Sequence, residues 1–195
     1  MRIAVIGPQY PDSFARCISE ALDDMGHQVI KVEDKRLTPH LPLWLKYTDK
    51  FKVKALESCL IQASPRFEKW VYRRLIPIIH GTNPELIINV SGGIPPEIID
   101  KVRRNGCKMV LWFPDSVGYL GRQYLVAADY DAFFLKDPSI VKMMREKFNK
   151  NAHYLPECCM PKWHKKVELS DKDTKYYGCD ITTAGSLYYY RARIF

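Results

Sequence analysis

Two polar side chains that could take part in chemistry follow an apolar run in "VLWFPDSV". Asp115 and Ser116 come shortly after the apolar residues that end at Phe113. A carboxylate in such a place can orient sugar hydroxyl groups or act as a general base. An Asp or Ser before a helix is also a common helix cap, so both interpretations stay open. Asp115 is the candidate catalytic residue of the chain.

Two other short segments place small or polar residues after apolar runs. "VSGGIPPE" puts Ser91, Gly92 and Gly93 before a proline-led segment. Glycines there let the backbone approach a ligand closely, although a tight turn before a helix explains them as well. "LKDPS" adds Lys136 and Asp137, which can bind a substrate or can be a solvated cation and a helix cap.

Glu157 follows a last apolar segment, "HYLPE". In an open parallel sheet, ligands bind beyond the carboxyl ends of the strands, where loops and free helix N–H groups meet. If these segments end the strands of one such sheet, their side chains lie along the same edge. The candidate substrate-binding residues are therefore Ser91, Gly92, Gly93, Ser116, Lys136, Asp137 and Glu157.

The pattern between these segments predicts such a sheet. Continuous apolar runs such as "RIAVIG", "LIINV" and "AFFL" alternate with amphipathic segments of helical spacing. In the first of these segments, "SFARCISEALDDMGH", Ser13 can cap a helix and Gly26 can end it. Buried strands that alternate with helices imply a parallel sheet covered on both faces. The predicted fold class is α/β, with a doubly wound, Rossmann-like parallel sheet.

This pattern fills residues 1–157 and is interrupted by a basic helical insert at 35–80. Residues 158–177 are polar with weak periodicity, which is typical of a linker. The remaining residues, 178–195, repeat the order of strand, glycine turn and helix start found at the amino terminus. We expect a strand from Cys179 to Ala184 and, after it, the start of a second α/β domain that is cut short.

The net charge of +8 is concentrated in one stretch, since residues 35–80 hold ten Lys or Arg against three acids, an excess of +7. Such an excess favours an anionic partner, such as a phosphate-bearing ligand or an anionic lipid surface, but a solvated helix face explains it equally well. Trp44 and Trp70 among the cations also suit a membrane interface, but ordinary helices packed on the sheet are the favoured explanation of these segments. No nucleic-acid-binding module is recognisable, so we expect no specific nucleic acid as partner.

Several functional classes lack their motifs. The chain has no GxGxxG after its first apolar run, no GxxxxGK[ST], no HExxH and no GxSxG. These absences argue against a dinucleotide-dependent dehydrogenase, a P-loop NTPase, a zincin and an α/β-hydrolase. The six cysteines show no metal-ligand spacing, and we expect neither a metal nor a cofactor. With no signal peptide and no apolar stretch of membrane length, a cytoplasmic location is expected.

The segments "NPELIINVSGG", "CKMVLWFPDSV", "YDAFFLKDPS" and, most specifically, "YYGCDITTAGSLYYYRARIF" resemble the CgeB-like spore-maturation glycosyltransferases. The resemblance covers most of the chain except roughly residues 36–80. It implies the GT-B architecture, in which one Rossmann-like domain binds the acceptor and a second binds a nucleotide-sugar donor, usually without a metal. It also implies that "AGSLYYYR" is the first strand-to-helix turn of the donor domain, where Gly185 and Ser186, close to the cleft, and Arg191, on the opening helix, would bind the donor.

On this resemblance the chain is the acceptor-side part of a glycosyltransferase, inactive or nearly so at this length. Its partners would be a nucleotide sugar and a sugar or glycan acceptor. Two other interpretations stay open. One is a non-catalytic α/β module that binds an anionic glycan, lipid or protein. The other is a phosphate- or nucleotide-binding regulator of flavodoxin-like topology.

Overall fold

The computed structural model describes residues 1–34, 50–103, 106–119, 122, 124–162 and 164–180. The chain falls into two compact units, Met1–Cys158 and Cys159–Phe195. Of the strand expected from Cys179 to Ala184, the described part is Cys179 and Asp180, which are not in a strand. Gly185, Ser186 and Arg191 lie outside the described residues.

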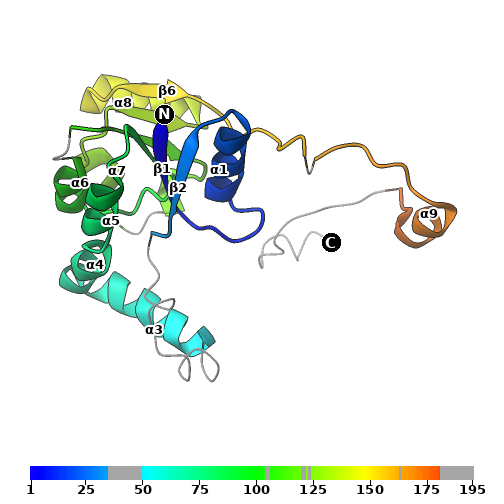
Figure 1. Ribbon diagram of the computed structural model, residues 1–195, viewed down its shortest axis with the longest axis horizontal. Helices are drawn as coiled ribbons and strands as arrows, with labels where there is room; N and C mark the ends of the chain where they lie inside the picture. The colour runs from blue at the N-terminus through cyan, green and yellow to red at the C-terminus, as the bar shows by residue number, and fades with distance from the viewer. Residues whose placement is uncertain (35–49, 104–105, 120–121, 123, 163, 181–195) are drawn as a thin grey trace. The chain divides into compact units, whose positions relative to one another are not determined.

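Six parallel strands form one sheet in the first unit, in the order β2-β1-β3-β4-β5-β6 (Figure 1). The strands are β1 (Arg2–Ile6), β2 (Gln28–Val32), β3 (Leu86–Asn89), β4 (Lys108–Phe113), β5 (Ala132–Leu135) and β6 (Ala152–Tyr154). Ile6, the last residue of β1, is in register with Val32 on one side and Asn89 on the other. The carboxyl ends of these strands therefore meet at one edge, as the sequence predicted.

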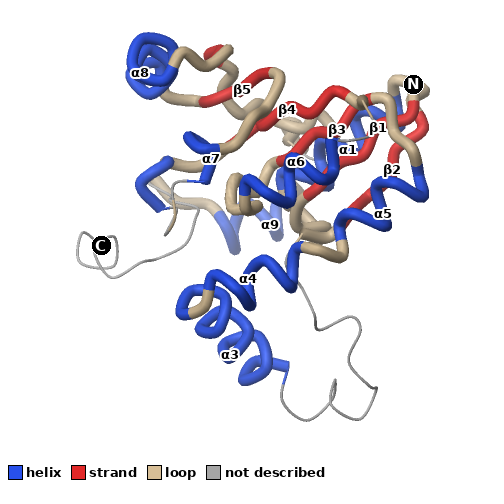
Figure 2. The backbone as a smooth tube through the Cα atoms, turned by 90° about the vertical axis from the view of Figure 1, so that its left-hand side faces the viewer, coloured by secondary structure: helices blue, strands red, loops and turns tan. Residues whose placement is uncertain are grey.

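Helices cover both faces of the sheet, which confirms the predicted doubly wound α/β fold (Figures 1 and 2). On one face, Ala15 and Ile18 of α1 (Phe14–Asp24) pack against Ile3 and Val5 of β1. The opposite face buries a larger apolar core. Its helices are α4 (Pro65–Tyr72), α5 (Leu75–Thr82), α6 (Pro96–Arg103), α7 (Tyr124–Ala127) and α8 (Pro138–Phe148).

Capping residues set the ends of α1 as the sequence predicted. The Ser13 hydroxyl accepts a hydrogen bond from the Arg16 backbone N–H at 3.4 Å and donates one to the Pro8 carbonyl at 2.6 Å. Gly26, just after the helix, has a φ of 79°, which glycine adopts without strain. These contacts fix the loop between β1 and α1 at the carboxyl edge of the sheet.

The described part of the basic insert forms three helices between β2 and β3, namely α3 (Lys50–Ala63), α4 and α5. Because β3 then pairs with β1, the strand order begins 2-1-3, as in flavodoxin-like sheets, whereas dinucleotide-binding sheets have the order 3-2-1. The point where the order reverses lies between β1 and β3. Ligands of open α/β sheets bind at this reversal, so the fold selects a place for the site.

In the second unit, α9 (Asp171–Tyr177) lies within the stretch that the sequence assigned to a linker. The Ser170 hydroxyl caps it by accepting a hydrogen bond from the Asp173 backbone N–H at 3.2 Å. None of the residues of α9 is buried, so capping and local charge hold this short helix. No helix in the described part of the chain is both long enough and apolar enough to cross a membrane.

Candidate functional site

A cavity of about 440 Å³ lies where the strand order reverses, and we call it the switch-point cavity. Its walls come from the loop after β1, from residues that follow β2, β3 and β4, and from α3. The side chains of interest in its wall are Tyr10, Ser13, Asp34, Glu57, Ser91 and Asp115. A site assembled from the ends of several parallel strands matches the place where ligands bind in this class of sheet.

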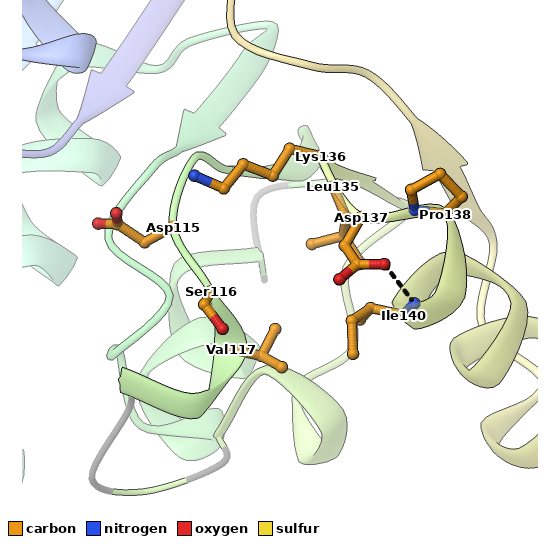
Figure 3. A pocket seen from close by; sticks show the side chains of 8 residues that line it. All are labelled: Asp115, Ser116, Val117, Leu135, Lys136, Asp137, Pro138 and Ile140. Atoms are coloured by element: carbon orange, nitrogen blue, oxygen red, sulfur yellow. Dashed lines mark hydrogen bonds between the residues drawn. The ribbon is translucent and has the colours of Figure 1, made fainter.

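A second cavity, of about 430 Å³, lies between the loops that follow β4 and β5, and we call it the β4–β5 cavity. Asp115 and Ser116 line it from one loop, and Lys136 and Asp137 line it from the other (Figure 3). Asp115 is an exposed side chain that also lines the switch-point cavity. The candidate catalytic residue is therefore shared by both cavities.

Asp34 is the most buried carboxylate in the wall of the switch-point cavity, with 4% of its surface exposed. Burial and, after it, the negative charge of Asp34 raise the pKa of the Tyr72 hydroxyl well above its usual range. Burial lowers the pKa of the Arg74 guanidinium, and the charges of Asp34 and Glu57 oppose that change. The described wall of the cavity is thus acidic, and the Arg74 guanidinium lies close enough to Asp34 and Glu57 for their charges to act on its pKa.

A second buried group, around Asn89, positions Ser91. The Asn89 side-chain amide is fully buried and donates a hydrogen bond to the Tyr130 hydroxyl at 2.7 Å. Its carbonyl oxygen accepts from the backbone N–H of Ser91 at 3.1 Å and from the Ser91 hydroxyl at 3.2 Å. Because every polar atom of Asn89 has a partner, the turn after β3 is held firmly at the cavity.

A polar cluster holds α3 over the switch-point cavity. Arg122 donates to the Glu68 carboxylate of α4 and to the carbonyl oxygens of Ile61, at 3.0 Å, and Gln62, at 2.7 Å. The Tyr124 hydroxyl also donates to Glu68, at 2.7 Å. Burial, followed by this bond to Glu68, raises the pKa of Tyr124 to about 12. The loop after β4, which carries Asp115, is thereby tied to the end of α3.

The predicted substrate-binding residues have several different places in the structure. Ser91 lines the switch-point cavity, and Ser116, Lys136 and Asp137 line the β4–β5 cavity. Asp137 is also the N-cap of α8, since its carboxylate accepts from the backbone N–H groups of Ser139 and Ile140.

The remaining predicted residues of the first unit lie outside the two cavity walls. Glu157 forms an ion pair with Lys136 at 3.0 Å, next to the β4–β5 cavity. Gly92 is buried with a φ of 62°, so this turn needs a glycine for its backbone conformation. A Cβ atom on Gly93 would lie 3.5 Å from the Tyr72 hydroxyl, which is ordinary contact.

Sequence reasoning missed Asp34, Glu57 and Tyr10. Asp34 had a usable signal, because an acidic residue that follows the second strand of such a fold can bind ligand hydroxyl groups. Glu57 had no such signal, since only the folded insert brings α3 to this edge of the sheet. Among the described residues, no three His, Cys, Asp or Glu side chains come together as metal ligands.

The fold and the two cavities define an α/β protein with a candidate ligand site at the carboxyl edge of a parallel sheet. The chain matches no protein-family model, no curated protein and no solved structure. The resemblance to CgeB-like glycosyltransferases therefore stays a prediction.

Proposed function

We propose that this chain is the acceptor-binding part of a glycosyltransferase of GT-B architecture, of the CgeB-like kind. The observation that carries the proposal is the position of Asp115, which lines both the switch-point cavity and the β4–β5 cavity. An acceptor in the first cavity can reach this carboxylate, and a sugar donor can approach from the side of the second. The two substrates of a transfer reaction need such an arrangement.

The chemistry of the switch-point cavity favours a neutral ligand rich in hydroxyl groups. The carboxylates of Asp34, Glu57 and Asp115 accept hydrogen bonds from hydroxyl groups but repel phosphate. The rings of Tyr10 and Phe14 give the same cavity an apolar wall, which ligand sites commonly have. These features support a sugar acceptor and speak against a phosphate-binding regulator.

In the proposed reaction, Asp115 accepts the proton of one acceptor hydroxyl group as its oxygen attacks the anomeric carbon of the donor sugar. A carbon–oxygen bond to the acceptor forms, and the bond between the sugar and the nucleoside diphosphate breaks. The proton stays on Asp115 until solvent removes it. Because the described residues contain one α/β domain, the donor would bind to a further domain, and the chain alone would transfer little or no sugar.

We also propose that the protein is cytoplasmic. All six of its cysteines are free, and four of them, Cys59, Cys158, Cys159 and Cys179, are exposed. Exposed thiols stay reduced in the cytosol, whereas secreted domains tend to pair them.

Ligand-detected NMR with a panel of neutral mono- and disaccharides tests the acceptor site. We expect at least one sugar to bind, and Asp34→Asn to weaken its binding by about tenfold, because a charged hydrogen-bond acceptor is lost. Asp100→Asn is the matched control, since Asp100 is exposed on α6 and lines neither cavity. Binding of inorganic phosphate at the cavity in place of every sugar would contradict the proposal.

Transfer needs its own experiment. If the reading frame continues beyond Phe195, the longer protein should hydrolyse UDP- or GDP-sugars far faster than the 195-residue chain. In that longer protein, Asp115→Asn should lower kcat by about a hundredfold or more, the usual contribution of a general base. Equal hydrolysis by the two lengths would contradict the division of roles.

A further inference from the structure

The outer face of α3 and α4, which we define as the side with Leu56, Leu60 and Trp70, carries large apolar side chains that are exposed. Leu56 and Leu60, one turn apart on α3, are 60% and 40% exposed, and Trp70 on α4 is 56% exposed. The rings of Phe67 and Trp70 lie next to each other, with centroids 5.5 Å apart. A group of exposed large apolar side chains on a folded domain usually marks an interaction site.

The inner faces of the same two helices already have their partners. Glu57 and Ile61 of α3 line the switch-point cavity, and Val71 and Tyr72 of α4 are buried. Each helix is therefore packed on its inner side and also carries exposed apolar side chains on part of its outer side. Figure 1 shows α4 and α3 below α5, with α3 the lower of the two.

Among residues 55–80, the exposed charged side chains of this face are positive. Residues 55–80 contain two acids, Glu57 and Glu68, and these are only 8% and 6% exposed. Arg66 and Arg73, by contrast, are exposed cations on α4 and at its end. Among the described neighbours, the one acid that reaches a cation of this face is Glu97 of α6, which pairs with Lys69 at 2.5 Å.

We propose that the outer face of α3 and α4 binds the surface of an anionic lipid bilayer. Leu56, Leu60 and Trp70 would enter the boundary between headgroups and acyl chains, while Arg66 and Arg73 would contact anionic headgroups. Apolar and aromatic side chains beside cations on the same helices are the features of an interfacial membrane contact. Nucleic acid would use the cations but gain little from two exposed leucines, so the bilayer is the better match. This surface does not depend on Asp115 or on sugar transfer.

Co-sedimentation with lipid vesicles tests the proposal. The 195-residue protein should bind vesicles of phosphatidylcholine with phosphatidylglycerol, bind pure phosphatidylcholine much less, and lose binding as salt screens the charges. Leu60→Ser with Trp70→Ser should lower the partition coefficient by about tenfold or more, because the apolar contact is lost. Arg66→Gln with Arg73→Gln should reduce the preference for the anionic lipid and the sensitivity to salt.

Helix α8 supplies matched controls, since Met143 and Phe148 are exposed apolar residues and Lys142 and Lys147 are exposed cations. Met143→Ser with Phe148→Ser, and Lys142→Gln with Lys147→Gln, should leave vesicle binding unchanged. All variants should keep the far-UV circular dichroism of the parent, because each change is at the surface.

Three results would overturn the proposal. The first is equal loss of binding in the α3–α4 and α8 variants, and the second is no loss in either. The third is tight binding to a single-stranded RNA oligomer without binding to anionic vesicles, which would assign the cations to nucleic acid.

Discussion

Gly7 lies where the chain leaves β1 and passes between the end of β3 and α1. A Cβ atom on Gly7 would lie 2.3 Å from Cγ2 of Val90 and 2.9 Å from Cβ of Ala15. The contact with Ala15 requires α1 to move, and the contact with Val90, which follows β3, requires its branched side chain to change rotamer or shift; Val90 also lines the switch-point cavity. We expect Gly7→Ala to lower the free energy of unfolding by about 2 kcal/mol in urea titrations, as overpacking does.

Gly81 in α5 is the matched control for this change. A Cβ atom there would have no heavy atom within 4 Å apart from those of its chain neighbours and of the backbone of its own helix. Since alanine favours helix over glycine, Gly81→Ala should raise the free energy of unfolding by about 0.5–1 kcal/mol. Destabilisation of similar size by both changes would show that the close packing around Gly7 is not the cause.

The contacts of Arg122 join α3, α4 and the loop that carries Asp115. Glu68 is nearly buried, and Arg122 and the Tyr124 hydroxyl both donate to its carboxylate. Removal of the cation would leave a buried carboxylate whose remaining donor, among the described residues, is the neutral hydroxyl of Tyr124. Such a loss costs far more than the loss of an exposed ion pair.

We therefore expect Arg122→Met to lower the free energy of unfolding by about 3 kcal/mol. Hydrogen exchange should also become faster at the end of α3, where Arg122 binds the carbonyl groups of Ile61 and Gln62. The double variant Arg122→Met with Glu68→Met should recover part of the lost stability. Lys69→Met, which breaks an exposed pair with Glu97, should cost under about 1 kcal/mol. Equal costs for Arg122→Met and Lys69→Met would refute a structural role for the cluster.

The elements were predictable where local signals and packing agree. Continuous apolar strands, the Ser13 cap and the glycine after α1 are all local signals, and the structure follows them. The helix α9 was missed because it buries nothing and so leaves no apolar pattern in the sequence. Short sequence patterns predict strands and capped helices correctly because these elements depend on residues only a few positions apart.

The site was predictable only in part, because its residues come from distant segments. The rule for parallel sheets selected Ser91, Asp115 and Lys136, which follow strands. The acidic character of the switch-point cavity depends instead on Asp34, which follows β2, and Glu57 of α3, which the fold brings into one cavity wall. Contacts of this kind form only when the insert packs against the sheet. The spacing of residues along the sequence does not predict them.

Three tyrosines in separate parts of the fold have hydroxyl groups that resist ionisation. Burial is the main cause in each case and raises the pKa of Tyr72, of Tyr124 and of Tyr130. In the unfolded chain a tyrosine loses its proton near pH 10. The folded protein keeps these protons to higher pH, so its stability should fall as the pH rises above about 10.

Tyr124 allows this dependence to be measured without the contribution of other groups that ionise at high pH. Tyr124→Phe removes the hydrogen bond to Glu68 and should cost about 1 kcal/mol in the free energy of unfolding at neutral pH. The pKa of Tyr124 is raised to about 12 in the folded protein, so the contribution of its hydroxyl is complete below pH 10 and declines between pH 10 and 12. The difference in stability between the parent and Tyr124→Phe should therefore shrink over this range in urea titrations, while lysines and cysteines affect both proteins alike. A difference that stays constant, or grows, would mean that the Tyr124 hydroxyl is not held in its neutral form by its surroundings.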